Sequence, residues 1–201
     1  MAARGPLSYT TRDAGRHCAA MATLAIALLA AAASAAVAPD DGDIAAAVHR
    51  EGREVVIDVD MRVDATPQEA WEVLTDYDHM SRFVPDLVSS RVIRRDGDRI
   101  EVAQQARFHF GPFSLEAENV RAIDLVPPRE IRSRLISGDM LSSTFVTRIA
   151  PDGNATRVTN HGEFIPNRWL PPFVGPAIVQ AQTRKQFAEI RAEILRRKRG
   201  A

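Results

Sequence analysis

The chain is poor in thiols, since Cys18 is the one cysteine among its 201 residues. A single cysteine excludes an internal disulfide framework and a metal site built from several thiolates. An excess of charge of one sign is also lacking, because 26 Lys and Arg residues balance 26 Asp and Glu residues. Proteins that neutralise nucleic-acid phosphates rely on a basic face. The sequence therefore predicts no nucleic-acid partner.

The motifs of several common enzyme classes are missing as well. The chain has no Gly-x-Ser-x-Gly elbow, P-loop or Gly-x-Gly-x-x-Gly turn. His79, His109 and His161 stand singly, without the spacing of paired metal ligands, so no metal and no cofactor are predicted. Asp76 and Asp78 could form an acid/base pair beside Tyr77. The favoured alternative is that both aspartates end a helix while Tyr77 packs near a cavity.

The first 38 residues have the three parts of a secretory signal. Arg4, Arg12 and Arg16 precede an apolar, alanine-rich run, which ends in small residues with candidate cleavage sites after Ala35 and Ala38. An uncleaved membrane anchor is the alternative, because residues 19–38 are long enough to span a bilayer. Cleavage would remove Cys18 and leave a slightly acidic, thiol-free chain. We predict export, to the periplasm if the host is a bacterium, or else anchoring to the inner membrane.

Residues 39–53 are acidic and alanine-rich, and we predict a linker without a core element. A domain then follows over residues 54–198. Residues 55–63 alternate between apolar and polar, which predicts a half-buried antiparallel strand. Thr66, Pro67 and Glu69 form the pattern of a capping box at the start of a helix that runs to about Tyr77. A second short helix or turn is predicted from Asp78 to Pro85.

Turn residues at regular spacing then divide the chain into six further strands. They are predicted at Val88–Arg95, Ile100–Phe110, Phe113–Leu125, Glu130–Ser137, Leu141–Ala150 and Thr156–Phe164. The period changes again between Phe173 and Lys198, which predicts one long helix. The apolar face of that helix is predicted to consist of Val174, Ile178, Ala181, Phe187, Ile190 and Ile194.

This order predicts an α+β fold in which a curved, seven-stranded antiparallel sheet grips the long C-terminal helix. The sequence resembles the START/Bet v 1-like (SRPBCC) superfamily, and within it the coenzyme Q-binding and polyketide cyclase/dehydrase branch. The resemblance rests on residues 63–77, Phe83 to Pro85, Gly138-Asp139 and the proline-rich segment before the last helix. It covers roughly Val59 to Lys198. The resemblance implies an apolar cavity between the sheet and the last helix.

Side-chain alternation predicts which residues line that cavity. The predicted lining consists of Val59, Met61, Gln104, Phe108, Phe110, Leu115, Asn119, Ser133, Leu135, Phe145, Asn160, Phe164 and Ile178, and the predicted mouth consists of Tyr77, Phe83, Trp169 and Phe173. An apolar wall with a few uncharged polar groups is typical of a small-molecule site. Those polar residues could equally be edge positions or core groups whose hydrogen bonds are satisfied. Trp169 and Phe173 either touch a lipid surface or cap the core.

The leading hypothesis is an exported, non-catalytic protein that holds a quinone, an isoprenoid or another lipid, with contact to a membrane surface. The basic end of the chain, Arg196–Arg199, suits the negative end of a helix dipole and would also be attracted to an anionic bilayer. One alternative is a cyclase, dehydratase or hydrolase acting on a polyketide-like substrate. Such an enzyme needs a titratable group in the cavity, such as Asp76, His79 or Arg134. A protein-interaction module is the other alternative.

Overall fold

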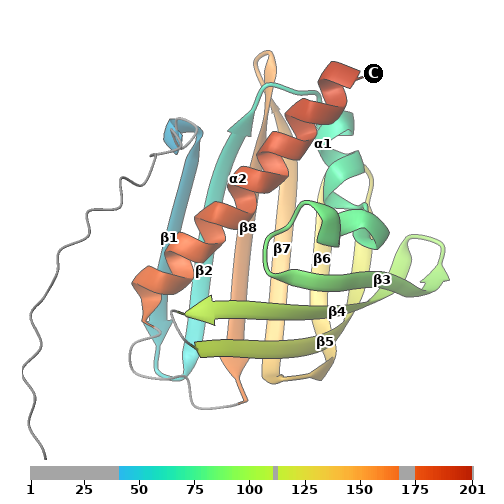
Figure 1. Ribbon diagram of the computed structural model, residues 1–201. Helices are drawn as coiled ribbons and strands as arrows, with labels where there is room; N and C mark the ends of the chain where they lie inside the picture. Colours follow the sequence, from blue (N-terminus) through green and yellow to red (C-terminus); the bar gives the residue numbers. More distant parts are fainter. Residues whose placement is uncertain (1–40, 111–112, 168–174, 201) are drawn as a thin grey trace, which may run out of the picture. The chain divides into compact units, whose positions relative to one another are not determined.

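The computed structural model describes residues 41–110, 113–167 and 175–200, without the side chains of Asp41, Phe110 and Phe113. One antiparallel sheet of eight strands carries a long helix, α2, on its inner face (Figure 1). The strand order is β1-β2-β8-β7-β6-β5-β4-β3. The strands are β1 (Ile44–Glu51), β2 (Glu54–Val63), β3 (Leu87–Asp96), β4 (Arg99–Phe110), β5 (Phe113–Val126), β6 (Glu130–Gly138), β7 (Met140–Asp152) and β8 (Ala155–Pro166). The helices are η1 (Asp41–Asp43), α1 (Pro67–Leu74), η2 (Tyr77–Arg82) and α2 (Pro176–Gly200).

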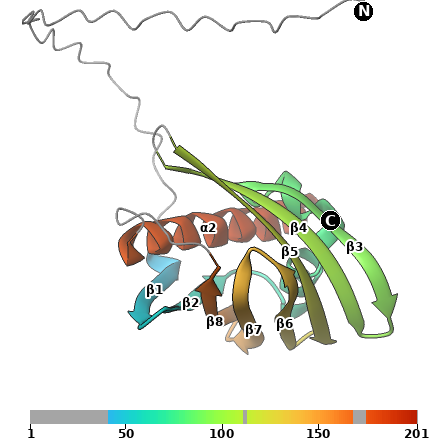
Figure 2. The ribbon, with the colours of Figure 1, turned by 90° about the horizontal axis from the view of Figure 1, so that it is seen from below.

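The sheet bends strongly around α2. In Figure 1 the strands β3, β4 and β5 run across the view, whereas β1, β2 and β8 stand upright. Seen from below, β3 to β5 rise along one side of α2 (Figure 2). Part of this bend coincides with a break in the pairing of β6 and β7, which pair in the described structure only between residues 130–134 and 144–148. The α+β helix-grip fold is therefore confirmed.

The local sequence signals that predicted the first elements are confirmed. Every second residue of β2 from Val55 to Val63 is buried. At the start of α1, the Thr66 amide donates to a Glu69 carboxylate oxygen at 2.6 Å and the Glu69 amide donates to Thr66 Oγ1 at 3.2 Å. This reciprocal pair satisfies two backbone donors that a helix start leaves free. The second short helix is the 3-10 helix η2.

The sheet has eight strands and not the seven that the sequence predicted. The additional strand is β1, which lies within the predicted linker and pairs along its whole length with β2, from Ile44 opposite Met61 to Glu51 opposite Glu54. Ile44 is buried, and Ala46 and Val48 pack against the core. The expectation that this stretch contributes no core element is wrong. Each alanine of β1 buries little apolar area, so the sequence gives a weak signal for this strand. The strand is held by its contacts with β2 and α2.

The long helix is confirmed, but its buried face is rotated from the predicted one. Ile190 and Ile194 are buried as predicted, and Phe187 is partly buried. Ile178 and Ala181 are exposed, whereas Val179 and Thr183 take the inner positions. Val174 lies outside the described residues. None of the helices in the described ranges is long and apolar enough to cross a membrane.

Candidate functional site

The inner face of the sheet is tightly packed at one end and loosely filled at the other. Toward α1, the inward residues of β4 to β8 are completely or almost completely buried: Ile100, Val102, Ile123, Ile131, Ile149 and Val158. Further along the same strands, the inward apolar residues are only partly buried: Phe108, Leu115, Leu135, Phe145 and Phe164. We call these five residues the open half of the inner face. Large apolar side chains that retain accessible surface there leave room for a bound apolar molecule.

A small set of polar side chains lies beside the open half. Gln104 donates to Ser90 Oγ at 3.2 Å, and Thr147 Oγ1 donates to Asn160 Oδ1 at 3.4 Å. The remaining members are Asn119, Arg121, Ser133 and Ser143. Two buried side-chain atoms in the described residues have no hydrogen-bond partner, namely Asn119 Oδ1 and Arg121 Nη2.

Arg121 is the one of these groups that carries a charge, and it is 8% exposed. Its Nε donates to Ser133 Oγ at 2.5 Å and its Nη1 donates to Ser143 Oγ at 3.0 Å. Its guanidinium carbon lies 5.1 Å from the centre of the Phe145 ring. The two serines come from β6 and β7, so the guanidinium bridges the strands close to where their pairing breaks. These contacts fix the orientation of the guanidinium and leave the Nη2 hydrogens unused.

The charge of Arg121 has no counter-ion among the described residues. Burial lowers its pKa to about 10, against an opposing influence of Tyr77. The guanidinium is therefore still protonated at neutral pH. Burial also raises the pKa of Tyr77, which is 8% exposed, so that its hydroxyl stays neutral. A buried charge without an opposite charge is costly, because the hydration it loses is not replaced.

The match to a family model decides to which group of proteins this fold and site belong. Residues 54–196 match the family described as polyketide cyclase/dehydrase and lipid transport. The chain belongs to this family. It is therefore a member of the SRPBCC, or START/Bet v 1-like, superfamily, as the resemblance of its sequence indicated. Members of the family include both lipid-transport proteins and cyclases.

Solved structures of the superfamily share the fold of this member at low sequence identity. A STAR-related lipid transfer protein from Xanthomonas axonopodis is 12% identical, with a TM-score of 0.64, and the match covers 76% of this chain and 94% of that one. The Zhui aromatase/cyclase from Streptomyces sp. R1128 is 17% identical, with a TM-score of 0.57, covering 72% and 95%. A protein from Thermus thermophilus is 16% identical, with a TM-score of 0.60, covering 70% and 97%. No curated protein matches the chain.

The structure of this family member places the predicted lining residues in three environments. Gln104, Phe108, Leu115, Asn119, Ser133, Leu135, Phe145 and Phe164 are partly buried at or beside the open half, and Asn160 is buried near them. Val59 and Met61 instead belong to the packed core, where Met61 has no accessible surface. Ile178 lies on the exposed side of α2. The Phe110 side chain and the predicted lip residues Trp169 and Phe173 lie outside the described parts.

Of the predicted mouth residues in the described ranges, Tyr77 lies in the interior, and Phe83 is partly buried against the core. Sequence reasoning missed Arg121, although a signal for it was present. The period of two that points Leu115, Ala117 and Asn119 inward also points Arg121 inward. On this strand the predicted inward residues ended at Asn119, and Arg121 is the next inward position.

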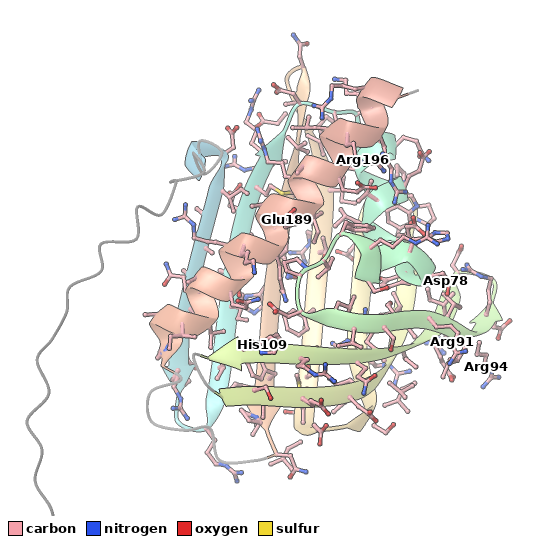
Figure 3. The ribbon with its side chains drawn as sticks, in the orientation of Figure 1. Asp78, Arg91, Arg94, His109, Glu189 and Arg196 are labelled. Atoms are coloured by element: carbon pink, nitrogen blue, oxygen red, sulfur yellow. The ribbon has the colours of Figure 1, made fainter. Side chains whose placement is uncertain are left out.

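The two histidines on strands lie apart from each other on the surface. His109 and His161 are exposed and lie on β4 and β8, which are not neighbours in the sheet. Figure 3 shows His109 near the end of β4 that is remote from the labelled Asp78. His161 contacts Asp58 at 2.7 Å, and this hydrogen bond raises the pKa of His161. The described residues contain no cluster of metal-binding side chains.

Asp76 and Asp78 do not form an acid/base pair. Asp78 accepts a hydrogen bond from the Val92 amide at 2.8 Å, which ties η2 to β3. Asp76 contacts His79 Nδ1 and Arg197 Nη2, each at 2.7 Å. Burial acts to raise the pKa of Asp76, but the hydrogen bonds from Arg197 and His79 outweigh it and lower this pKa. Asp76 is therefore an anchor between η2 and α2.

The basic end of α2 borders a hollow of about 630 Å³ whose lining is largely charged. Its lining residues are Asp76, His79, Arg82, Phe83, Glu193, Arg196 and Arg197. Glu193 accepts hydrogen bonds from Arg196 and Arg197 at 2.6–2.7 Å. Arg196 lies near the C-terminal end of α2, and Glu189 lies further back on the same helix (Figure 3). These ion pairs hold the last turns of α2 and connect them to η2.

We expect the Glu193 ion pairs to make stability depend on pH. Hydrogen bonds from Arg196, and then from Arg197, lower the pKa of Glu193 from 4.5 to about 2. A carboxylate with a lowered pKa stabilises the fold above the pKa of the unfolded chain, and the contribution is lost as the pH falls from about 4.5 to 2. The contribution is on the order of 2–3 kcal/mol at neutral pH.

The measurement is urea unfolding of wild type and Glu193→Gln between pH 7 and pH 2.5. The difference between their free energies of unfolding should be largest at pH 7 and shrink as the pH falls. A difference that stays constant over this range would contradict the assignment. Glu189→Gln on the same helix, whose side chain is exposed, serves as the control and should show little difference at any pH.

Proposed function

We propose that this protein binds a hydrophobic small molecule, such as a quinone, an isoprenoid or another lipid, at the open half of the inner face and carries it. The observation that supports this most directly is the contrast between the two halves. One half is packed as a core, whereas in the other Phe108, Leu115 and Phe145 are only partly buried on the inner face of the sheet. Membership of a family that includes lipid-transport proteins agrees with a carrier.

The protonation states of the interior favour binding over acid/base catalysis. A general acid or base works best when its pKa lies near the working pH. Tyr77 and Arg121, two buried titratable groups that influence each other's pKa, both hold their protons at neutral pH. His79 and Arg134 are exposed, and Asp76 is held by Arg197 and His79. A cyclase remains the second candidate, because a buried guanidinium would stabilise an enolate.

Export and membrane contact are further parts of the proposal. Residues 1–38 have the composition of a secretory signal, which would place the carrier in the periplasm or on the outer side of the inner membrane. Trp169 and Phe173 are proposed to form the lip that touches the membrane. Fractionation of the host cells, with a blot against this chain, tests export. Full-length protein in the cytoplasmic fraction would contradict it and reopen the interaction-module alternative.

Native mass spectrometry of the protein purified from its own host tests the binding proposal. We expect a hydrophobic molecule bound one to one, recoverable by solvent extraction. Leu135→Trp should lower this occupancy, because the indole would fill part of the open half. Ile136→Trp, on the opposite face of the same strand at a position 47% exposed, is the matched control. Ligand-free protein that also binds no added quinone, prenol or fatty acid would overturn the proposal.

A further inference from the structure

We infer that the ligand carries one anionic oxygen, which pairs with the free Nη2 edge of Arg121. This inference rests on the proposed binding function and narrows it to amphiphiles with an acidic group. It begins from an imbalance within the protein. Arg121 is protonated and nine-tenths buried, and no carboxylate of the described residues pairs with it. A ligand anion is the component that would balance this charge.

Other arginines of the sheet show what a balanced arrangement looks like. Arg99 contacts Asp124 at 2.6 Å, Arg107 contacts Glu116 at 2.8 Å and Arg157 contacts Asp60 at 2.9 Å. Each of these pairs is on exposed surface, where water also solvates the charges. Arg121, in contrast, has two serine hydroxyls and an aromatic face, which are all neutral. Arg121, whose burial makes its charge more costly, therefore has weaker partners than the exposed arginines.

The geometry also limits what kind of anion fits. Ser133 and Ser143 occupy Nε and Nη1, and the Phe145 ring covers one face of the guanidinium. The unused N–H groups are the two on Nη2 and the second one on Nη1, and they suit an oxygen of a carboxylate or of an ionised enol or phenol. Because Phe145 also belongs to the open half, an apolar tail attached to that oxygen would lie along the same wall.

Paired probes, each an anion and a neutral analogue with the same apolar part, test the inference. One pair is palmitate and hexadecanol. The other is an alkylated 2-hydroxy-1,4-naphthoquinone and its methyl ether, so the two pairs separate a carboxylate from an ionised enol. Affinities are measured at pH 7.5 by displacement of a neutral fluorescent dye. For wild type, we expect the anion of at least one pair to bind about tenfold tighter than its neutral partner, as one charge-assisted hydrogen bond allows.

Arg121→Met should reduce this preference for the anion over its neutral partner to less than about threefold. Arg95→Met, at an exposed arginine of β3, is the matched control and should keep the full preference. Circular dichroism and thermal unfolding check that both variants fold. If Arg121→Met does not fold, the comparison of anionic and neutral probes on wild type still tests the inference. Arg121→Lys should then retain part of the preference for the anion.

The failures of the two proposals are distinguishable. If wild type binds both members of each pair equally well, the anion inference is overturned while the binding function stands. An undiminished preference in folded Arg121→Met overturns it in the same way. If none of the four probes binds and no molecule co-purifies, the binding function itself fails, and the inference with it.

Discussion

Replacing Ile123 by alanine is expected to lower the free energy of unfolding by about 2–5 kcal/mol, whereas Leu115→Ala on the same strand should cost less than about half as much. Both residues point toward α2 from β5. Ile123 is 2% exposed and packs in the core cluster, so truncation leaves a cavity that its neighbours close only in part. Leu115 is only partly buried in the open half, so its truncation removes less buried apolar surface. Urea unfolding of the ligand-free protein measures both effects.

Ligand binding should be affected more by Leu115→Ala than by Ile123→Ala, the opposite of the order expected for stability. Leu115→Ala removes part of the proposed binding wall and should weaken binding of a neutral probe, whereas Ile123→Ala should leave the affinity nearly unchanged when measured well below its unfolding transition. Val88→Ala, at an exposed position on β3, is the control for both measurements. Equal losses of stability at Ile123 and Leu115 would show that the inner face is packed evenly and would contradict a binding site there.

Much of the fold follows from short-range patterns that the sequence shows directly. The alternation from Val55 to Val63 predicted β2, because one face of an antiparallel strand is buried and the other is wet. Thr66 and Glu69 predicted the start of α1, since their capping bonds are made within four residues and need no distant partner. The turn residues between strands predicted the other strands to within about two residues, which is the usual uncertainty of element ends.

The features that were missed depend on distant partners. The strand β1 contains several alanines, and its burial becomes evident only when β2 and α2 are in place. The predicted buried face of α2 differs from the observed one, because Val179 and Thr183, and not Ile178 and Ala181, lie on the inner side of the helix. A hydrophobic pattern alone cannot identify the buried face of a helix when that face contains a threonine.

The candidate site was predicted in outline but without its charge. Alternation brought Leu115, Leu135 and Phe145 to one face correctly, because adjacent strands share that face. Arg121 was not included because the inward positions predicted on its strand ended at Asn119. Its serine partners are on β6 and β7, and the pairing of strands had to be known before they could be recognised.

Replacing Gly138 by alanine is expected to destabilise the protein by roughly 3 kcal/mol or more, because two costs combine there. Gly138 has a φ of 136°, a conformation that side chains with a Cβ rarely adopt. A Cβ at this position would lie 2.1 Å from the Glu118 carbonyl oxygen and 2.7 Å from Asn119 Cα. Both are backbone atoms, so relief requires β6 to move away from β5.

Neighbouring hydrogen bonds explain why the two strands come so close at Gly138. The Asp139 amide donates to the Glu118 carbonyl oxygen at 3.0 Å, and the Glu118 amide donates to Asp139 Oδ2 at 2.9 Å. The Gly138-Asp139 pair thus clamps the end of β6 onto β5, beside the irregularity in register between Val120 and Arg121. Because that irregularity helps to set where Arg121 meets Ser133, Gly138→Ala should also weaken the preference for anionic probes.

Gly97→Ala is the control that separates the two costs of Gly138→Ala, the steric clash and the unfavourable φ. Gly97 has a φ of 58°, but apart from its chain neighbours no residue comes within 4 Å of where a Cβ would lie, so its replacement should cost only about 1 kcal/mol. Thermal and urea unfolding of the two variants should therefore differ clearly. Similar losses for both would show that the approach of β6 to Glu118 contributes little. An unchanged anion preference in a destabilised but folded Gly138→Ala would separate the clamp from the placement of Arg121.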